Sequence, residues 1–362
     1  MKFNSISLKN FVIFAAFFFV LAAGAKAQSG LEISPAARDY LNEALDIMQK
    51  NSLLKKQVDW EDLRRKTFEK AAGAQETIDT WDAIRFALRS IGDNHSFLQL
   101  TDELAEKEKS RRKTENPSKA QTTQSRTPSP YAKRRTPEGF VHKLDGCVVG
   151  QIVVPLYLAQ KGDDFATVLN KFIADTDGRN PCGWIVDLRG NGGGNIFPML
   201  AGVGALLDEG DASYAIDADD KQTAFFYKNG QSGLREPDGK ETFITKIEGE
   251  AYKVKKQLPV AVLIDGGTAS SGEGIAMAFR GRKNTRFFGT HTFGVSTSNE
   301  GFRLSDGANI VLTTGVGADK NGVRYFSGIA PDEKIETGET MPPAEKDPVV
   351  LAALEWLKKQ AR

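Results

Sequence analysis

The sequence is poor in the residues that bind transition metals, with two cysteines and three histidines among 362 residues. Cys147 and Cys182 cannot make a zinc site without histidines at ligand spacing, and His142 and His291 are too scattered along the chain to supply them. We therefore expect neither a metal nor a cofactor. The two cysteines leave two alternatives open, a disulfide or two free buried thiols beside core strands.

The sequence also lacks an excess of charge of either sign. Lysine and arginine number 48, aspartate and glutamate 47, and the formal net charge is +1. Such a balance gives no electrostatic footprint for nucleic acid, so we do not expect nucleic acid as a partner. With 40% hydrophobic and 26% charged residues, the composition is typical of a globular protein with a sizeable core.

Residues 1–27 have the pattern of a secretory signal peptide. Two lysines accompany an apolar stretch at 11–23, and the small-residue sequence Ala25-Lys26-Ala27 forms a cleavage site. The apolar stretch is shorter than the roughly 18 residues that usually cross a bilayer, which disfavours an uncleaved anchor. We expect an exported protein, periplasmic or secreted, whose mature chain starts at Gln28 and has no transmembrane segment.

The rest of the chain divides into three parts by composition. Residues 28–104 carry apolar side chains at helical spacing, which predicts three amphipathic helices in an N-terminal cap. Residues 105–138 have Tyr131 as their only large apolar side chain, many basic residues and several prolines, which predicts a disordered basic linker. Residues 139–362 alternate between strand and helix patterns, as an α/β core does.

The core is expected to begin with a strand, a helix and a second strand. The first strand covers 148–154, the helix starts at Asp163 or Asp164, and the second strand covers 184–188. The polar segment 208–256 is interpreted as a strand-bearing excursion that covers the functional site described below. Further predicted elements are a strand at 286–288, hairpin turns at Asp306-Gly307 and Asn321-Gly322, and a last helix that starts at Asp347-Pro348.

The stretch Gln257 to Glu273 places two serines where a strand runs into a helix. Residues 259–264 are rich in β-branched side chains and predict a central strand, and the turn residues 265–267 follow it. Ser270 precedes Glu273 by three residues, the capping-box spacing that marks a helix start. Unpaired N–H groups at such a position can stabilise an oxyanion, so Ser270 is a candidate nucleophile, with ordinary helix capping as the alternative.

A second strand, at 184–188, ends in the glycine-rich sequence Gly190 to Asn195. This loop lacks the last glycine of G-x-G-x-x-G, and no Gly-Lys-Ser/Thr follows it, so phosphate binding is the minor option. Its other use is to let backbone amides approach a substrate carbonyl. The amide of Ser271 and that of a loop glycine, Gly192 or Gly193, would then form an oxyanion hole.

Four motifs, in this order, resemble those of the C-terminal processing, or tail-specific, serine peptidases. They are DLRGNGGG at 187–194, GTASSGE at 267–273, GTHTFG at 289–294 and GIAPD at 328–332. Tricorn protease and the retinoid-binding repeats are similar relatives. The resemblance covers roughly residues 145–332 and implies a crotonase/ClpP-like ββα core, an N-terminal helical cap, a serine hydrolase mechanism and Ser270 as the nucleophile. Residues 105–138 are too few and too polar for the PDZ domain that many of these proteases carry, so tail specificity is not expected.

One departure from the family concerns the general base. The processing proteases use a lysine in a TFGKG segment, but here residues 292–294 are followed by Val295, and Asn299 stands where that group carries glutamine. The tricorn-like branch uses a histidine from the N-terminal region instead. The sequence Asp93-Asn94-His95-Ser96 is similar to that motif, so His95 is the candidate base.

The group that orients His95 stays open at this stage. The tricorn-like branch has a glutamate near the GIAPD segment, whereas residues 325–327 of this chain are tyrosine, phenylalanine and serine. A lysine that enters the site is the alternative base, and the candidates are Lys253, Lys255, Lys256 and Lys283.

The sequence therefore predicts an exported serine peptidase that hydrolyses peptide or protein substrates through an acyl-enzyme on Ser270, with His95 as the base. The alternative is a non-catalytic protein that binds a ligand or peptide on the same scaffold, because a fold does not fix a function. Hydrolysis of another carbonyl substrate, such as an ester, is a third reading.

Overall fold

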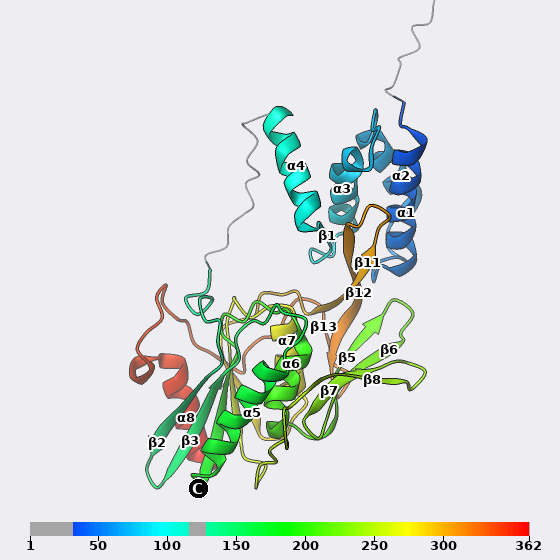
Figure 1. Ribbon diagram of the computed structural model, residues 1–362. Coiled ribbons are helices and arrows are strands. Elements are labelled where there is room, and N and C mark those ends of the chain that lie inside the picture. Colours follow the sequence, from blue (N-terminus) through cyan, green and yellow to red (C-terminus); the bar gives the residue numbers. More distant parts are fainter. Residues whose placement is uncertain (1–31, 116–127, 362) are drawn as a thin grey trace, which may run out of the picture.

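The computed structural model describes residues 32–115 and 128–361, which form a mixed α/β structure with two sheets (Figure 1). The predicted signal peptide, residues 1–27, lies outside the described residues. Within them, no helix is both long and apolar enough to cross a membrane.

A six-stranded sheet forms the centre of the core, in the order β14-β10-β9-β4-β3-β2. All of its neighbours pair in parallel except β2 and β3. Its strands are β2 (Glu138–Leu144), β3 (Cys147–Val153), β4 (Pro181–Asp187), β9 (Val260–Ile264), β10 (Thr285–Gly289) and β14 (Glu333–Lys334). The parallel pair β3 and β4, joined by the helix α5 (Asp163–Asp177), confirms the predicted strand-helix-strand unit.

Helices cover both faces of this sheet. On one face α5 packs with α6 (Ile196–Val203), the short η2 (Gly204–Leu206) and α7 (Ser271–Arg280), while α8 (Pro348–Gln360), preceded by η3 (Ala344–Lys346), packs on the other. Strand β9 shows why its sequence is apolar throughout. Val260, Val262 and Ile264 face α5 to α7, and Ala261 and Leu263 face α8.

The second sheet is antiparallel and has eight strands. Its main path is β1-β12-β5-β6-β7-β8, and β11 and β13 also pair with β12. The strands are β1 (Phe97–Gln99), β5 (Gly210–Asp217), β6 (Gln222–Lys228), β7 (Gln231–Arg235), β8 (Glu241–Lys246), β11 (Thr297–Arg303), β12 (Asn309–Asp319) and β13 (Arg324–Tyr325). Strands β5 to β8 confirm the strand-bearing excursion predicted at 208–256, and the hairpins on either side of β12 confirm the two predicted turns.

The N-terminal helices are α1 (Pro35–Asn51), α2 (Trp60–Lys70), the short η1 (Thr77–Thr80) and α3 (Trp81–Ile91). Their apolar faces pack together and around the tip of the β11–β12 hairpin, through Leu304, Ala308, Ile310 and Leu312. Figure 1 shows this hairpin, in orange, rising from the core into the blue helices. Strand β1 pairs with β12, so the turn between α3 and β1 lies beside the hairpin.

The expectation of a disordered linker at 105–138 is wrong for residues 105–115, which belong to the helix α4 (Asp102–Glu115). Lysine, arginine and glutamate dominate this segment, and these residues are strong helix formers. Asp102 and Glu103 suit the positive end of the helix, and Glu108 pairs with Arg85 of α3 at 2.7 Å. Residues 116–127 lie outside the described part of the chain.

The linker expectation is also wrong for residues 128–137, because polar contacts fix this segment on the core. The hydroxyl of Tyr131, a buried residue, donates to Asp347 Oδ2 at 2.9 Å. Arg134 Nη1 donates to Asp187 Oδ2 at 2.8 Å. Composition indicated disorder because apolar residues are scarce, yet here charged and hydroxyl groups provide the anchoring.

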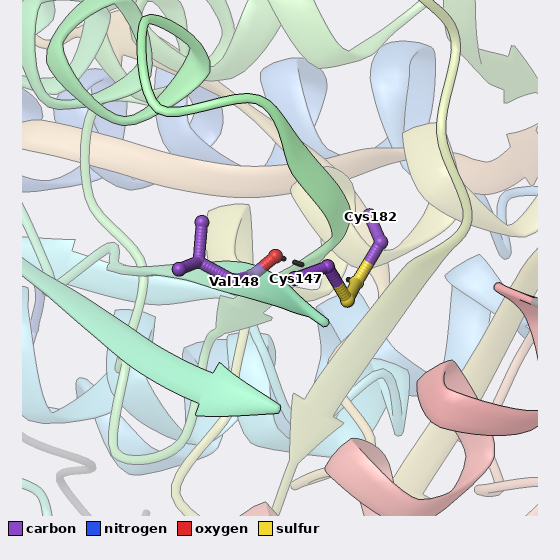
Figure 2. The surroundings of a disulfide bond; sticks show 3 residues. All are labelled: Cys147, Val148 and Cys182. Carbon is purple, nitrogen blue, oxygen red and sulfur yellow. Dashed lines mark hydrogen bonds between the residues drawn. A yellow bond between two sulfur atoms is a disulfide. The ribbon is translucent and has the colours of Figure 1, made fainter. Parts of the chain in front are cut away.

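Cys147 and Cys182 form a disulfide, which decides between the two alternatives left open by the sequence. Figure 2 shows the bond joining the starts of the neighbouring strands β3 and β4. The two residues are 35 positions apart, and a cross-link of that span restricts the unfolded chain and so stabilises the fold.

Candidate active site

Ser270 occupies the sharp turn between β9 and α7. Helix α7 begins at Ser271, and Ser270 and Glu273 form the predicted capping-box pair. The backbone of Ser270 has φ 50° and ψ −120°, a conformation that costs a non-glycine residue roughly 1–3 kcal/mol and that persists where the surroundings enforce it. A strained strand-to-helix turn presents the nucleophile in the α/β-hydrolases.

Glu273 holds this turn in place. Its carboxylate is fully buried and accepts four hydrogen bonds. Oε2 accepts the N–H groups of Ser270 and Val295 at 2.9 and 3.0 Å, and Oε1 accepts the Thr292 hydroxyl and the Gly294 N–H at 2.6 and 3.0 Å. Burial raises the pKa of Glu273, and the donated hydrogen bonds oppose that rise. One carboxylate thus joins the Ser270 turn to the segment at 292–295.

The glycine-rich loop is tied to the same turn by a second set of hydrogen bonds. Asp265 Oδ1 accepts the N–H of Gly190 at 2.9 Å, and the carbonyl of Asn191 accepts the N–H of Ala269 at 2.9 Å. The hydroxyl of Thr268 donates to the carbonyl of Leu188 at 2.9 Å. These contacts bring the two motifs that the sequence analysis singled out into direct contact.

Gly193 lies against the candidate nucleophile. It has φ 97°, and a Cβ at this position would lie 2.8 Å from Ser270 Cβ and 3.0 Å from Ser271 N, so only glycine fits. Its own N–H donates to Asn191 Oδ1 at 2.9 Å. Gly193 can therefore donate to an oxyanion only if that bond is given up. Over the described ranges no acceptor bonds the N–H of Ser271 or of Gly192.

A buried network of ion pairs stabilises the start of the glycine-rich loop. Arg189 pairs with Asp187 at 2.7 Å and with Asp347 at 2.8 Å, and its guanidinium stacks on Tyr131 at 4.0 Å from the ring centroid. Burial opposes ionisation of Asp187, but Arg189 and Arg134 outweigh it and lower the pKa of that carboxyl to about 2. The network joins the end of β4 to the segment before β2 and to the start of α8.

Ser270 and Ser271 line a cavity of about 680 Å³. Its walls are the starts of α6 and α7, the strands β5 to β7, and the β11–β12 pair. Apolar side chains, among them Phe197, Phe225 and Met277, line part of it. The space is large enough for several residues of an extended peptide.

The charged residues that line the cavity are mostly acidic. They are three carboxylates, Asp217, Glu236 and Glu300, and one ammonium, Lys221. Within the described ranges none of these four side chains forms an ion pair, whereas the neighbouring Asp219 pairs with two lysines of the N-terminal helical region. The cavity therefore favours positively charged ligands.

His95 lies in the turn between α3 and β1 and is not itself among the residues that line the cavity. Its Nδ1 lies 2.7 Å from the hydroxyl of Thr297, which itself lines the cavity together with Ser270. In the described part of the chain no hydrogen bond joins the side chains of His95 and Ser270. Burial lowers the pKa of His95 below its ordinary value, and Asp93 opposes that change.

The lysines named as alternative bases are not among the residues that line the cavity. Lys253 is exposed and lies 3.5 Å from Glu209, and Val295, at the position of the family's lysine, directs its N–H to Glu273. The lysine that does line the cavity is Lys221, which sequence reasoning missed. It follows β5 in a segment that carried no motif, so only the fold could reveal it.

In the part of the chain that the structure covers, no group of three or more histidine, cysteine, aspartate or glutamate side chains is arranged to hold a metal ion.

Replacing Glu273 with glutamine should disrupt the site through its backbone. An amide nitrogen would face two of the four donors, and each unsatisfied buried donor costs about 1–3 kcal/mol. We expect the free energy of unfolding to fall by roughly 2–6 kcal/mol in denaturant titrations, together with a large loss of the activity expected of Ser270. The exposed Glu250→Gln serves as the control. An active Glu273→Gln enzyme of unchanged stability would contradict the role of this carboxylate.

Comparison with known proteins identifies relatives over most of the chain. Residues 148–335, more than half of the chain, match the family described as Peptidase family S41. The nisin-resistance protein of Lactococcus lactis subsp. lactis is 25% identical over 333 residues, which cover 91% of this chain and 90% of the relative. The carboxy-terminal processing protease CtpA of Bacillus subtilis is 30% identical over 156 residues, but these cover 42% of this chain and 28% of CtpA.

Solved structures agree on the fold. A lipoprotein from Streptococcus agalactiae has a TM-score of 0.62 at 23% identity, and the photosystem II D1 C-terminal processing protease has a TM-score of 0.57 at 16% identity. Each likeness covers 91% of this chain and 98% of the other. Together with the family match, which includes both the glycine-rich loop and the Ser270 turn, these findings identify the chain as a serine-type peptidase that belongs to peptidase family S41.

Proposed function

We propose that the protein hydrolyses peptide bonds through an acyl-enzyme formed on Ser270, with His95 as the general base. The observation that carries this proposal is the strained turn at Ser270, which Glu273 holds beside a cavity of about 680 Å³. Strained backbone conformations of this kind cluster at sites where a reactive group is presented.

The first step is attack of Ser270 Oγ on the carbonyl carbon of the scissile bond. The hydroxyl proton passes to Nε2 of His95, and the carbonyl oxygen becomes an oxyanion. Collapse of this intermediate breaks the C–N bond, and His95 returns the proton to the leaving amine. Water, activated by the same histidine, then attacks the ester on Ser270 and releases the acid.

The N–H of Ser271 is the first donor that we assign to the oxyanion. Ser271 is the first residue of α7, and at this end of a helix the dipole favours negative charge. The second donor comes from the glycine loop. Gly192 is the better candidate there, because the N–H of Gly193 already donates to Asn191.

His95 must come within hydrogen-bonding distance of Ser270 for the proton to move. Its contact with Thr297, which lines the same cavity as Ser270, supports this role. Catalytic hydrogen bonds are often long before substrate binds and shorten in the complex. The N-terminal helices hold the β11–β12 hairpin that carries Thr297, so they would act as the expected cap and bring base and nucleophile together.

We also propose that the protein is exported and that its core is of the crotonase/ClpP-like type. The disulfide supports export, because such bonds persist in oxidising compartments. The order β2, β3 and α5 is one ββα unit of the expected core. The name of the Lactococcus lactis relative concerns nisin resistance, so we include nisin among the candidate substrates.

Replacing Ser270 with alanine should abolish peptide hydrolysis and leave the melting temperature within a few degrees of the wild type. The mechanism assigns the hydroxyl to bond formation, whereas packing depends on its neighbours. Hydrolysis of a fluorogenic peptide library measures the effect, and Ser271→Ala is the matched control. Loss of activity in the Ser271 variant alone would show that the nucleophile is the second serine.

Replacing His95 with alanine should lower kcat on the order of a thousandfold, as removal of a triad base does elsewhere. Because the neutral ring is the base and burial lowers its pKa, the acid limb of kcat/KM should lie below the ordinary histidine value of about 6.5. A lysine base would place that limb at about pH 7–8 or above. His142→Ala, on β2, is the control. Full activity without His95, or an acid limb above neutrality, would exclude the histidine mechanism.

The charge of the cavity predicts a preference for basic substrates. Peptides that carry lysine or arginine near the scissile bond should have a higher kcat/KM than matched peptides with glutamate, and salt should weaken the preference. Neutralising Asp217, Glu236 and Glu300 together should reduce this preference roughly tenfold. Each ion pair between one of these carboxylates and a basic side chain of the substrate contributes about 0.2–1 kcal/mol.

The control for this triple variant removes the same charge elsewhere on the surface. It carries glutamines at three exposed positions that do not line the cavity, Glu248, Glu250 and Glu339. A preference for acidic peptides, or an equal response of both triple variants, would contradict recognition by the cavity carboxylates.

A further inference from the structure

The turn that carries His95 is stabilised by hydrogen bonds to a carboxylate of the same turn. Asp93 Oδ1 accepts the N–H groups of His95 and Ser96 at 2.9 and 2.8 Å, and Oδ2 accepts the hydroxyl of Ser96 at 2.6 Å. Aspartate commonly shapes tight turns in this way. The imidazole ring therefore needs a different partner to fix its orientation.

Strand β11 contacts both the backbone and the ring of His95. Asn299 Nδ2 donates to the carbonyl of His95 at 3.1 Å, and Thr313 of β12 fixes that amide by donating to its Oδ1 at 3.0 Å. The hydroxyl of Thr297 lies 2.7 Å from Nδ1 of the ring. Over the described residues this hydroxyl is the one hydrogen-bonding partner of the imidazole.

We propose that Thr297 is a positioning residue, which fixes His95 in the tautomer with its proton on Nδ1 and leaves Nε2 as the proton acceptor. This inference rests on the proposed role of His95 as the base. A hydroxyl can accept from a protonated Nδ1 or donate to an unprotonated one. Only the first arrangement leaves Nε2 able to take the proton of Ser270.

Thr297 performs one of the two tasks of the carboxylate in a serine triad. It orients the ring, but as a neutral group it does not stabilise the imidazolium. Asp93 is the charged group that acts on the ring, and on β11 the carboxylate of Glu300 accepts the hydroxyl of Thr314 instead. A base held in this way stays neutral, and so competent, into weakly acidic solution.

The test is the tautomer of His95, read by ¹⁵N NMR of histidine-labelled full-length protein. The chain has only three histidines, so His142→Ala and His291→Ala variants assign the ring signals. At neutral pH His95 should show the Nδ1–H tautomer, which is the minor form of histidine in water. Its detection needs neither substrate nor turnover.

Variants of Thr297 separate orientation from packing. Thr297→Val keeps the shape of the side chain and removes the hydroxyl, so the ring should lose the Nδ1–H tautomer. The value of kcat should then fall roughly ten- to a hundredfold, a part of the 10²–10⁴ that a general base supplies. Thr297→Ser should restore both. Thr245→Val, a buried threonine on β8 outside the cavity, is the matched control.

Replacing Thr297 with aspartate adds the missing charge. A carboxylate beside the ring favours the imidazolium, so the midpoint of the acid limb should move to higher pH. An unchanged midpoint would contradict the contact between the side chain at position 297 and the ring of His95.

An Nε2–H tautomer in the wild type, or an Nδ1–H tautomer that survives in Thr297→Val, would overturn the inference. Neither result depends on the reaction. Failure of the proposed function appears separately, as full activity in His95→Ala with the tautomer of the wild type unchanged.

Discussion

The candidate active site depends on one buried carboxylate. Glu273 accepts hydrogen bonds from Ser270 and from three groups of the segment at 292–295, so a single side chain sets the distance between the Ser270 turn and that segment. The positive φ of Ser270 is unfavourable by itself, and the bond from its N–H to Glu273 offsets part of that strain. The segment at 292–295 supports the turn largely through its backbone, because Gly294 and Val295 both donate their N–H groups to Glu273.

A buried network of charged residues fixes the glycine-rich loop, which is the other part of the site. Arg189 bridges Asp187 and Asp347, and so connects the base of the glycine loop to the helix on the far face of the sheet. The charges are buried but paired and hydrogen-bonded, which is the condition under which a fold tolerates them. The segment before β2 closes this network through Tyr131 and Arg134. A stretch that looks like a linker is therefore part of the support of the loop.

How much the sequence could predict follows from the range of each interaction. Local signals were sufficient for the strand-helix-strand unit, the hairpin turns and the start of α7 at Ser271, because periodicity and capping act over a few residues. The ordering of residues 128–137 could not be predicted, since Tyr131 meets Asp347 across more than two hundred positions. The contact of His95 with Thr297 is equally remote, and the presence of Lys221 in the cavity depends on how the antiparallel sheet folds over α7.

The central claim is that the strained turn makes Ser270 the nucleophile. Its most direct test is to react the folded protein with a fluorophosphonate and to map the modified residue by mass spectrometry of proteolytic peptides. The account predicts one adduct per chain, on Ser270, which disappears when the protein is unfolded before labelling. An adduct on Ser271 or on a serine outside the cavity, or no adduct on the folded protein, would contradict it.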